Sequence, residues 1–180
     1  MSKALLIIDI QNDYFQGGKC ELVNPKEASL KAKVLLEHFR KNSMPIFHIQ
    51  HINLRQGATY LLPNTLGVEI DENVKPLEHE IRIEKNFPNS FLETNLEWEL
   101  EKLHVKELVI CGMMSHMCID STTRAAFDLG FDCTVAHDAC ATKDLIFSDK
   151  RINAHEVHHA FMSALGTIFA KVVSVEEILK

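Results

Sequence analysis

The nine residues 112–120, GMMSHMCID, place a cysteine between a strand-like run and a helix-like run. Cys118 then lies near the start of a helix, where unpaired backbone N–H groups and the helix dipole favour a thiolate and an oxyanion. A free thiol has a pKa of about 8.5, so a nucleophilic cysteine needs a base or a cation beside it. Cys118 is therefore a candidate nucleophile.

Two charged residues, Asp9 and Lys85, can supply those partners. Asp9 ends the first strand-like run and Lys85 follows the third, and ligands of open parallel sheets bind beyond the carboxyl ends of the strands. In a Cys-Asp-Lys scheme, Asp9 takes the thiol proton and returns it to a leaving amine, while Lys85 holds the carboxylate and favours the charged pair. A strand-terminal Asp and a Lys before a loop are also common in structures without catalysis. The residues alone leave a hydrolase and a non-catalytic small-metabolite-binding protein both open.

The elements that must position these residues alternate between short β-branched runs and segments of helical period, as in a parallel sheet covered on both faces. Residues 53–75 are broken by Gly57, Pro63 and Gly67 and predict a long binding loop. We expect an α/β fold, a three-layer αβα domain over residues 1–180 with a roughly six-stranded parallel open sheet. The expected strands are 3–10, 45–51, 80–84, 106–112, 131–137 and 168–173, and the expected helices are 25–41, 92–104, 116–129 and 149–165.

Composition limits the classes of partner. A chain of 180 residues with 46% hydrophobic content can bury one large core. The formal net charge of −6 and the lack of a clustered basic face argue against nucleic acid. The apolar runs fall far short of the roughly 20 residues of a spanning helix, and the N-terminal run lacks the length and cleavage signal of a leader. The five cysteines form no CxxC pair and are expected to be free thiols, which predicts a cytoplasmic protein. The short apolar runs predict that it has no membrane partner.

Three blocks, in order, resemble the isochorismatase-like cysteine hydrolases, the superfamily of nicotinamidases and N-carbamoylsarcosine amidohydrolase. ALLIIDIQNDYF (4–15) is similar to the strand-one motif, whose last Asp is the base, here Asp9. EKNFPNSF (84–91) is similar to the lysine block and contains Lys85. GMMSHMC (112–118) is similar to the nucleophile block, which ends in Cys118, and the likeness continues to about residue 141.

The resemblance implies hydrolysis of a small-molecule amide or related C–N bond through a thioester, with no cofactor and in a dimer or tetramer. It also implies a cis peptide at Met113-Met114 and an oxyanion hole made by the N–H groups of Met114 and Cys118. True isochorismatases often lack the cysteine, so Cys118 points to the amidase side. Candidate substrate contacts from the same loops are Gln11, Phe15, Phe87 and Met113.

One histidine group suggests zinc chemistry instead. HEVHH (155–159) satisfies the HExxH pattern of zinc hydrolases. The helical period, however, predicts a buried stripe through Val157, Phe161, Ala164 and Ile168, which turns His155 and His159 toward solvent or a partner subunit. The face that carries His155, His158 and His159 is a weak candidate for a subunit contact. Zinc hydrolysis therefore stands as the less favoured alternative.

Two other groups raise metal binding near the cysteine. Nicotinamidases hold a metal after strand two, where His48 and His51 lie, but residues three apart on a strand point to opposite faces and the Asp-x-His pattern is missing. We expect both at the pocket rim. A soft copper site of His116, Cys118 and the neighbouring methionines lacks a partner cluster, so these methionines are expected to be apolar filler. No metal site is predicted.

Overall fold

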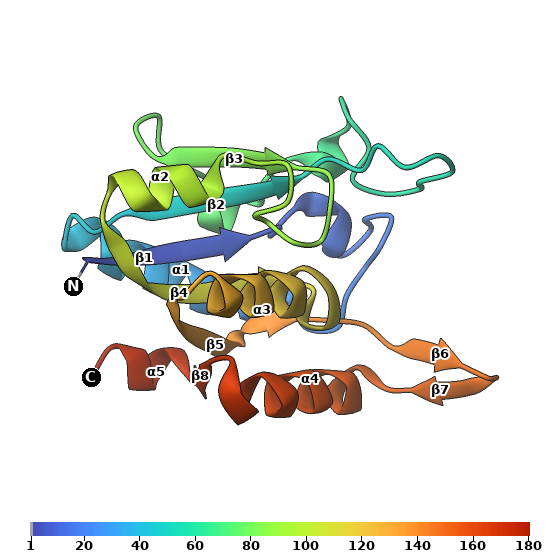
Figure 1. The fold of residues 1–180 in the computed structure, drawn as a ribbon. Helices are drawn as coiled ribbons and strands as arrows, with labels where there is room; N and C mark the ends of the chain where they lie inside the picture. Colours follow the sequence, from blue (N-terminus) through green and yellow to red (C-terminus); the bar gives the residue numbers. More distant parts are fainter. Residues whose placement is uncertain (1) are drawn as a thin grey trace.

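The computed structural model describes residues 2–180, which form a six-stranded parallel sheet between two layers of helices (Figure 1). The strand order is β3-β2-β1-β4-β5-β8. The order reverses between β1 and β4, so the crevice of an open sheet lies beyond their carboxyl ends. The α/β prediction with a roughly six-stranded parallel sheet is confirmed. The strands are β1 (Ser2–Ile8), β2 (Ile46–His51), β3 (Ile81–Lys85), β4 (Val105–Met113), β5 (Asp132–Ala141) and β8 (Lys171–Val173).

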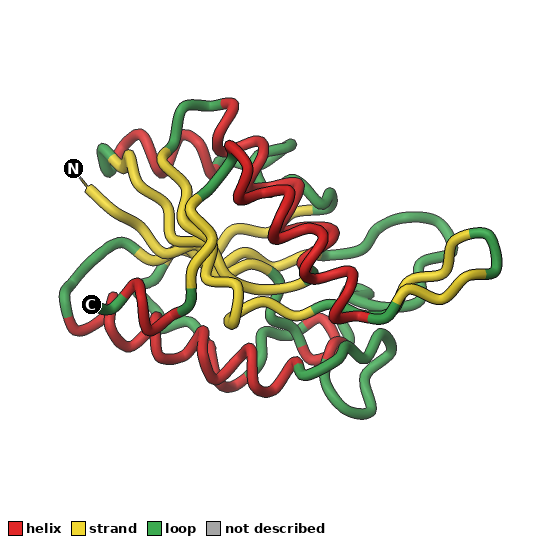
Figure 2. The backbone as a smooth tube through the Cα atoms, turned by 90° about the horizontal axis from the view of Figure 1, so that it is seen from below, coloured by secondary structure: helices red, strands yellow, loops and turns green. Residues whose placement is uncertain are grey.

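Helices cover both faces of the sheet because its central strands are apolar on both sides. Along β1, Leu5 and Ile7 pack into the core beneath α1 (Pro25–Lys41) and α5 (Val175–Ile178). Leu6 and Ile8 pack into the opposite core beneath α2 (Leu96–Lys102), α3 (Asp120–Asp128) and α4 (Ala154–Ile168). Figure 2 shows the strands between these two layers. Within residues 2–180, no helix has both the length and the apolar character to cross a membrane.

Gly112 lets β4 approach β1 closely just before the nucleophile block. Its φ is 131°, and a Cβ built there would lie 1.9 Å from the Ile8 carbonyl oxygen. Only glycine adopts this conformation and fits this space. Gly112 therefore sets how the residues after β4 meet those after β1.

A hairpin replaces part of a predicted helix. Strands β6 (Leu145–Phe147) and β7 (Lys150–Ile152) pair antiparallel around Ser148 and Asp149, which both have positive φ, and the hairpin projects from the body (Figure 1). The helix expected from residue 149 begins instead at Ala154. Asn153 caps it, because its Oδ1 accepts from the Glu156 N–H at 3.0 Å.

The buried stripe of α4 also differs from the predicted one. Its buried residues are Ala154, Val157, Met162 and Leu165. Phe161 is half-buried, whereas Ala164 is exposed and Ile168 is 63% exposed. The buried stripe therefore passes through Met162 and Leu165, one residue beyond each of the predicted positions 161 and 164, and it includes Ala154 at the start of the helix.

Candidate active site

The three predicted catalytic residues lie together at the carboxyl edge of the sheet. Asp9 follows β1, Lys85 is the last residue of β3, and Cys118 lies in the π-helical turn Ser115–Ile119 that follows β4. All three are buried, with 0%, 2% and 4% of their surface exposed. Lys85 Nζ is 2.7 Å from Asp9 Oδ2. A carboxylate oxygen of Asp9, Cys118 Sγ and a ring nitrogen of His51 all lie within 4.8 Å of one another.

The ammonium group of Lys85 is held by more than Asp9. Lys85 Nζ donates to the carbonyl oxygens of Phe87 at 3.0 Å and Pro88 at 3.2 Å, and lies 3.3 Å from His51 Nδ1. Burial lowers the pKa of Lys85, but Asp9 and Cys118 raise it further, so the net pKa lies above its usual value. Lys85 is therefore a fixed cation under the carboxylate of Asp9.

Asp9 is held in a sparsely populated backbone conformation. Its φ is 51°, in the left-handed region, and its N–H donates to the Ile49 carbonyl at 3.0 Å. Such conformations persist where the surrounding structure over-determines them, and they cluster at functional sites. Among the contacts within residues 2–180, Asp9 Oδ1 is buried and has no hydrogen-bond partner. This oxygen is free to receive a proton.

The surroundings of Cys118 favour its neutral thiol. Burial and the carboxylate of Asp9 raise the pKa of Cys118 well above that of a free thiol, and the nearby Lys85 offsets only part of this. These surroundings oppose the thiolate that the start of a helix would favour. The physical reason is that the sulfur is nearly excluded from water and faces an anion as well as a cation. Ionisation must accompany proton transfer.

His51 enters the site, whereas His48 lies away from it. The expectation that both lie at the pocket rim is wrong for His48, which is 1% exposed and whose Nε2 lies 2.8 Å from Glu80 Oε2. The two rings have separate environments, as their spacing on a strand predicts. Burial, Lys85 and Arg55 lower the pKa of His51 to about 4 against the opposing effect of Asp9, so its ring is neutral at neutral pH.

A small pocket of about 40 Å³ opens beside Cys118. Part of its wall comes from the predicted binding loop, because residues 53–61 bend back over the site. The N–H of Leu61 donates to Asp13 Oδ2 at 2.6 Å, which ties this loop to the turn after β1. The pocket is lined by Tyr14, His51, Asn53, Arg55, Tyr60, Leu61, Pro88, Met114, Met117 and Cys118.

The four candidate substrate contacts lie outside this lining. The Gln11 side chain bonds the N–H and carbonyl of His51 and the carbonyl of Val68, so it ties β2 to the loop. Phe15 packs against the core beneath α1, and Met113 is fully buried in that core. Phe87 contributes its carbonyl oxygen to Lys85. These residues support the groups that line the pocket.

The turn between β4 and α3 has the shape that the resemblance implies. The Met113–Met114 peptide bond is cis. The carbonyl of Met114 accepts the N–H groups of Met117 at 3.0 Å and Ile119 at 3.2 Å, which closes the turn around Cys118. Met114 and Cys118 both line the pocket.

The HEVHH segment is not built as a zinc-hydrolase site. Glu156 Oε2 accepts from the Asn153 N–H at 3.3 Å, so the glutamate that would act as base completes the cap of α4. His155 and His159 are exposed. The copper hypothesis also has no support, because among residues 2–180 the metal-capable group around Cys118 includes His51 and Asp9 but not His116. His116 bonds the Thr142 hydroxyl instead.

Comparison with known proteins identifies the family. The family model of the isochorismatase domain matches residues 3–177. The chain belongs to the isochorismatase family. It is 53% identical over 180 residues, the whole of both chains, to the isochorismatase family protein YddQ of Bacillus subtilis. It is 28% identical over 190 residues to Nicotinamidase 3 of Arabidopsis thaliana, with 97% of this chain and 86% of the relative covered.

A solved structure agrees with this assignment. The crystal structure of an isochorismatase hydrolase from Oleispira antarctica superposes with a TM-score of 0.95 at 44% sequence identity, covering 99% of this chain and 96% of that one. The protein is thus an isochorismatase-family hydrolase. Family membership favours an enzyme over the small-metabolite-binding protein that the residues alone left open.

Sequence reasoning missed part of the pocket. Arg55 and Tyr60 come from an irregular loop whose path has no periodic signal, and His51 was placed at the rim. One signal was present for His51. The end of β2 must lie beside the end of β3, where Lys85 was already a candidate, and the two residues are direct partners in the sheet.

Proposed function

We propose that this isochorismatase-family hydrolase cleaves a small-molecule amide or related C–N bond through a thioester on Cys118. The observation that carries the proposal is the buried Asp9–Lys85 pair beside the cysteine, with Lys85 Nζ 2.7 Å from Asp9 Oδ2. A buried ion pair costs desolvation free energy, and active sites are where such perturbed groups gather. The similarity to an enzyme named Nicotinamidase 3 supports the choice of an amide.

In this mechanism Cys118 Sγ attacks the substrate carbonyl carbon as its proton passes to Asp9 Oδ1. The carbonyl oxygen becomes an oxyanion, which the N–H groups of Met114 and Cys118 stabilise. The C–N bond then breaks as Asp9 returns the proton to the leaving nitrogen, which leaves a thioester. Water next attacks the thioester with Asp9 as base, and the acid and the free thiol are released.

Asp9 suits the role of base better than the neighbouring His51. The pKa of His51, about 4, makes its ring a weak base, and its Nδ1 already lies 3.3 Å from the Lys85 ammonium. Asp9 Oδ1 is unpaired within residues 2–180. Lys85 neutralises the resting carboxylate and keeps it in place, so Asp9 can take and return a proton without leaving a bare buried charge.

Lys85 also argues against metal catalysis at this place. Asp9, His51 and Cys118 offer an oxygen, a nitrogen and a sulfur within 4.8 Å of one another, which is a plausible ligand set for Zn²⁺. The Lys85 ammonium, however, lies against both Asp9 and His51. A divalent cation would meet this charge in a buried site, where repulsion is strong. The residues fit a proton-transfer site better than a metal site.

A panel of small amides, nicotinamide included, tests the proposal by ammonia release. For a turned-over amide, intact-protein mass spectrometry after rapid acid quench should show an acyl adduct on Cys118. Cys118→Ala should lose turnover and adduct together. Cys133→Ala is the matched control, because Cys133 is also buried and free but does not line the pocket. Turnover that survives in Cys118→Ala would reject the thioester route.

A further inference from the structure

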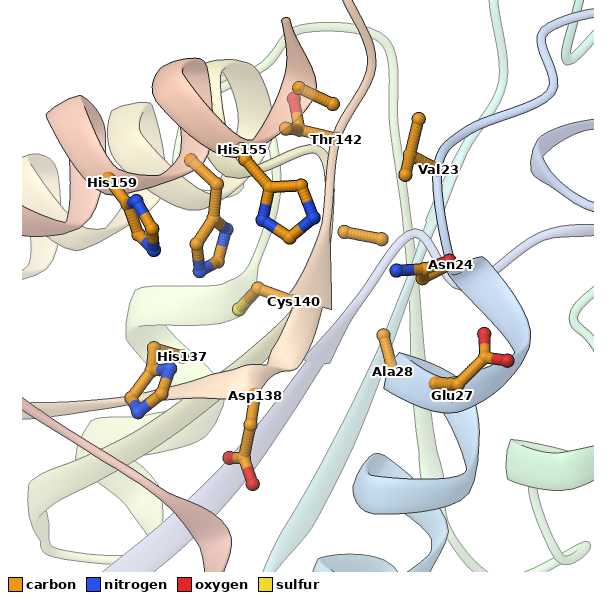
Figure 3. Close-up of a pocket in the computed structure, with 13 residues that line it drawn as sticks. Val23, Asn24, Glu27, Ala28, His137, Asp138, Cys140, Thr142, His155 and His159 are labelled. Atoms are coloured by element: carbon orange, nitrogen blue, oxygen red, sulfur yellow. The ribbon is translucent and has the colours of Figure 1, made fainter.

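A second cleft, separate from the Cys118 pocket, collects four histidines. It has a volume of about 280 Å³ and lies between α4, β5 and the start of α1 (Figure 3). His137 comes from β5, and His155, His158 and His159 come from α4. Nothing in the hydrolytic mechanism uses these rings.

The rings are close enough for two elements to share one ion. The centroid of the His158 ring lies 6.3 Å from that of His137 and 6.1 Å from that of His159. Zn–N bonds of about 2.0 to 2.1 Å at a tetrahedral ion place two ligating rings about 5 Å apart, centroid to centroid. The His137–His158 and His158–His159 rings are therefore each about 1 Å farther apart than in a tetrahedral site, so side-chain rotations that bring the rings together are needed to bind one ion.

The hydrogen bonds of Ser115 fix which nitrogen of His158 is free. Ser115 Oγ lies 3.3 Å from the Ala141 carbonyl oxygen, which can only accept, and 2.9 Å from His158 Nδ1. A hydroxyl has one proton to donate, so His158 Nδ1–H is the donor to Ser115. His158 Nε2 then carries the free lone pair. A ring whose other N–H is anchored in this way is the usual form of a metal-binding histidine.

The charged groups of the cleft favour a metal that prefers nitrogen. Asp138 is occupied, because its Oδ1 accepts from the Val175 N–H at 2.8 Å and its Oδ2 lies 3.4 Å from Lys31 Nζ. The other donors that line the cleft are four imidazoles, the Glu27 carboxylate and the Cys140 thiol, which bonds the Ala136 carbonyl at 3.4 Å, so imidazoles are the majority. Imidazole suits Zn²⁺, Ni²⁺ and Cu²⁺, whereas Mg²⁺ and Ca²⁺ prefer oxygen.

We propose that this cleft binds one divalent transition-metal ion, Zn²⁺ or a similar borderline metal, through His137, His158 and His159. The site differs from the HExxH pattern, because it uses His158 in place of the Glu156 base and adds a ligand from β5. Its role is ligand binding and not hydrolysis. His155, whose ring lies 6.1 Å from that of His159, borders the site on the next turn.

Calorimetric titration of Zn²⁺ into tag-free protein stripped with EDTA tests the proposal. The parent should bind one equivalent. His137→Ala, His158→Ala and His159→Ala should each weaken binding at least tenfold. His79→Ala is the matched control, since His79 is exposed and lies outside the cleft, and it should bind like the parent. His159 is also exposed, so its loss should leave the fold intact, as circular dichroism can check.

A second variant separates this cleft from the active site, whose Asp9, His51 and Cys118 are also metal-capable. Cys118→Ser should retain the Zn²⁺ affinity of the parent. The proposal is overturned if the parent shows no saturable Zn²⁺ binding. It is equally overturned if the three histidine variants bind like the parent, or if Cys118→Ser abolishes binding.

Discussion

The charge of Asp9 should suppress the reactivity of Cys118 while making catalysis possible, and Asp9→Asn separates the two effects. Asn has nearly the shape of Asp but no charge. With the carboxylate oxygen and Cys118 Sγ within 4.8 Å, two unit charges at an effective dielectric constant of 20 repel by about 3.5 kcal/mol. This equals about 2.5 pKa units. The substitution should lower the pKa of Cys118 by about that amount.

The expected rate change is smaller than the change in thiolate fraction. Below the parental pKa, a drop of about 2.5 units raises the thiolate fraction about 300-fold, but thiolate nucleophilicity falls with pKa with a Brønsted coefficient of about 0.45. The net expectation is about 20-fold faster alkylation of Cys118. Turnover should move the opposite way, because loss of a general base costs about 10² to 10⁴ in kcat/KM.

Iodoacetamide labelling against pH, followed at each cysteine by peptide mass spectrometry, measures the first effect. Cys111 and Cys133 serve as buried internal references, and Asp128→Asn on the exposed end of α3 is the charge control. Alkylation of Cys118 that is unchanged or slower in Asp9→Asn would refute the reasoning. It would mean that the Asp9 charge does not govern the thiol.

Three further predictions concern stability, each followed by urea unfolding. Lys85→Met leaves the Asp9 carboxylate buried without its cation and should lower the free energy of unfolding by about 3 to 5 kcal/mol. The double variant Asp9→Asn/Lys85→Met should recover most of this loss. A double variant no more stable than Lys85→Met would contradict the prediction. Burial raises the pKa of Glu80, but hydrogen bonds from Arg40, the Leu77 N–H and His48 lower it to about 2. The folded pKa of Glu80 is thus below the unfolded value of 4.5, so its contribution to the free energy of unfolding is present above pH 4.5 and is lost as pH falls toward 2. In Glu80→Gln the free energy of unfolding should therefore fall less steeply with decreasing pH. Equal slopes for the parent and the variant would count against this prediction. Gly112→Ala places a Cβ 1.9 Å from the Ile8 oxygen and should cost more than about 3 kcal/mol, whereas a loss below about 1 kcal/mol would show that β4 shifts freely.

Periodicity predicted the sheet because its strands are apolar on both faces, but it did not predict the β6–β7 hairpin. The signal there is a two-residue turn, and the usual Asn-Gly is replaced by Ser148-Asp149. Both residues adopt positive φ without glycine, and Ser and Asp are common at helix starts as well as in turns, so their types do not decide between the two. The polar run was therefore assigned to the helix that starts after Asn153.

The sequence predicts those residues of the candidate site that lie at the ends of strands. It does not predict those whose position depends on tertiary contacts. Asp9 and Cys118 follow β1 and β4, and Lys85 ends β3; the carboxyl ends of these strands share one edge, so the meeting of the three residues follows from topology. The place of Tyr60 depends on how the loop returns over the site, which the Leu61–Asp13 hydrogen bond fixes. The ionisation of Cys118 depends on burial, which no local pattern reveals.

The ion pair between Asp9 and Lys85 crosses one strand, since β2 lies between β3, which carries Lys85, and β1, which Asp9 follows. β3 is an edge strand, held by a neighbour on one side only. Local openings at an edge cost less than unfolding of the whole domain. Fraying of this single strand removes the cation and leaves the carboxylate unsupported, while the other five strands stay paired. The enzyme thus carries the cation of its proposed catalytic site on a strand that can open locally.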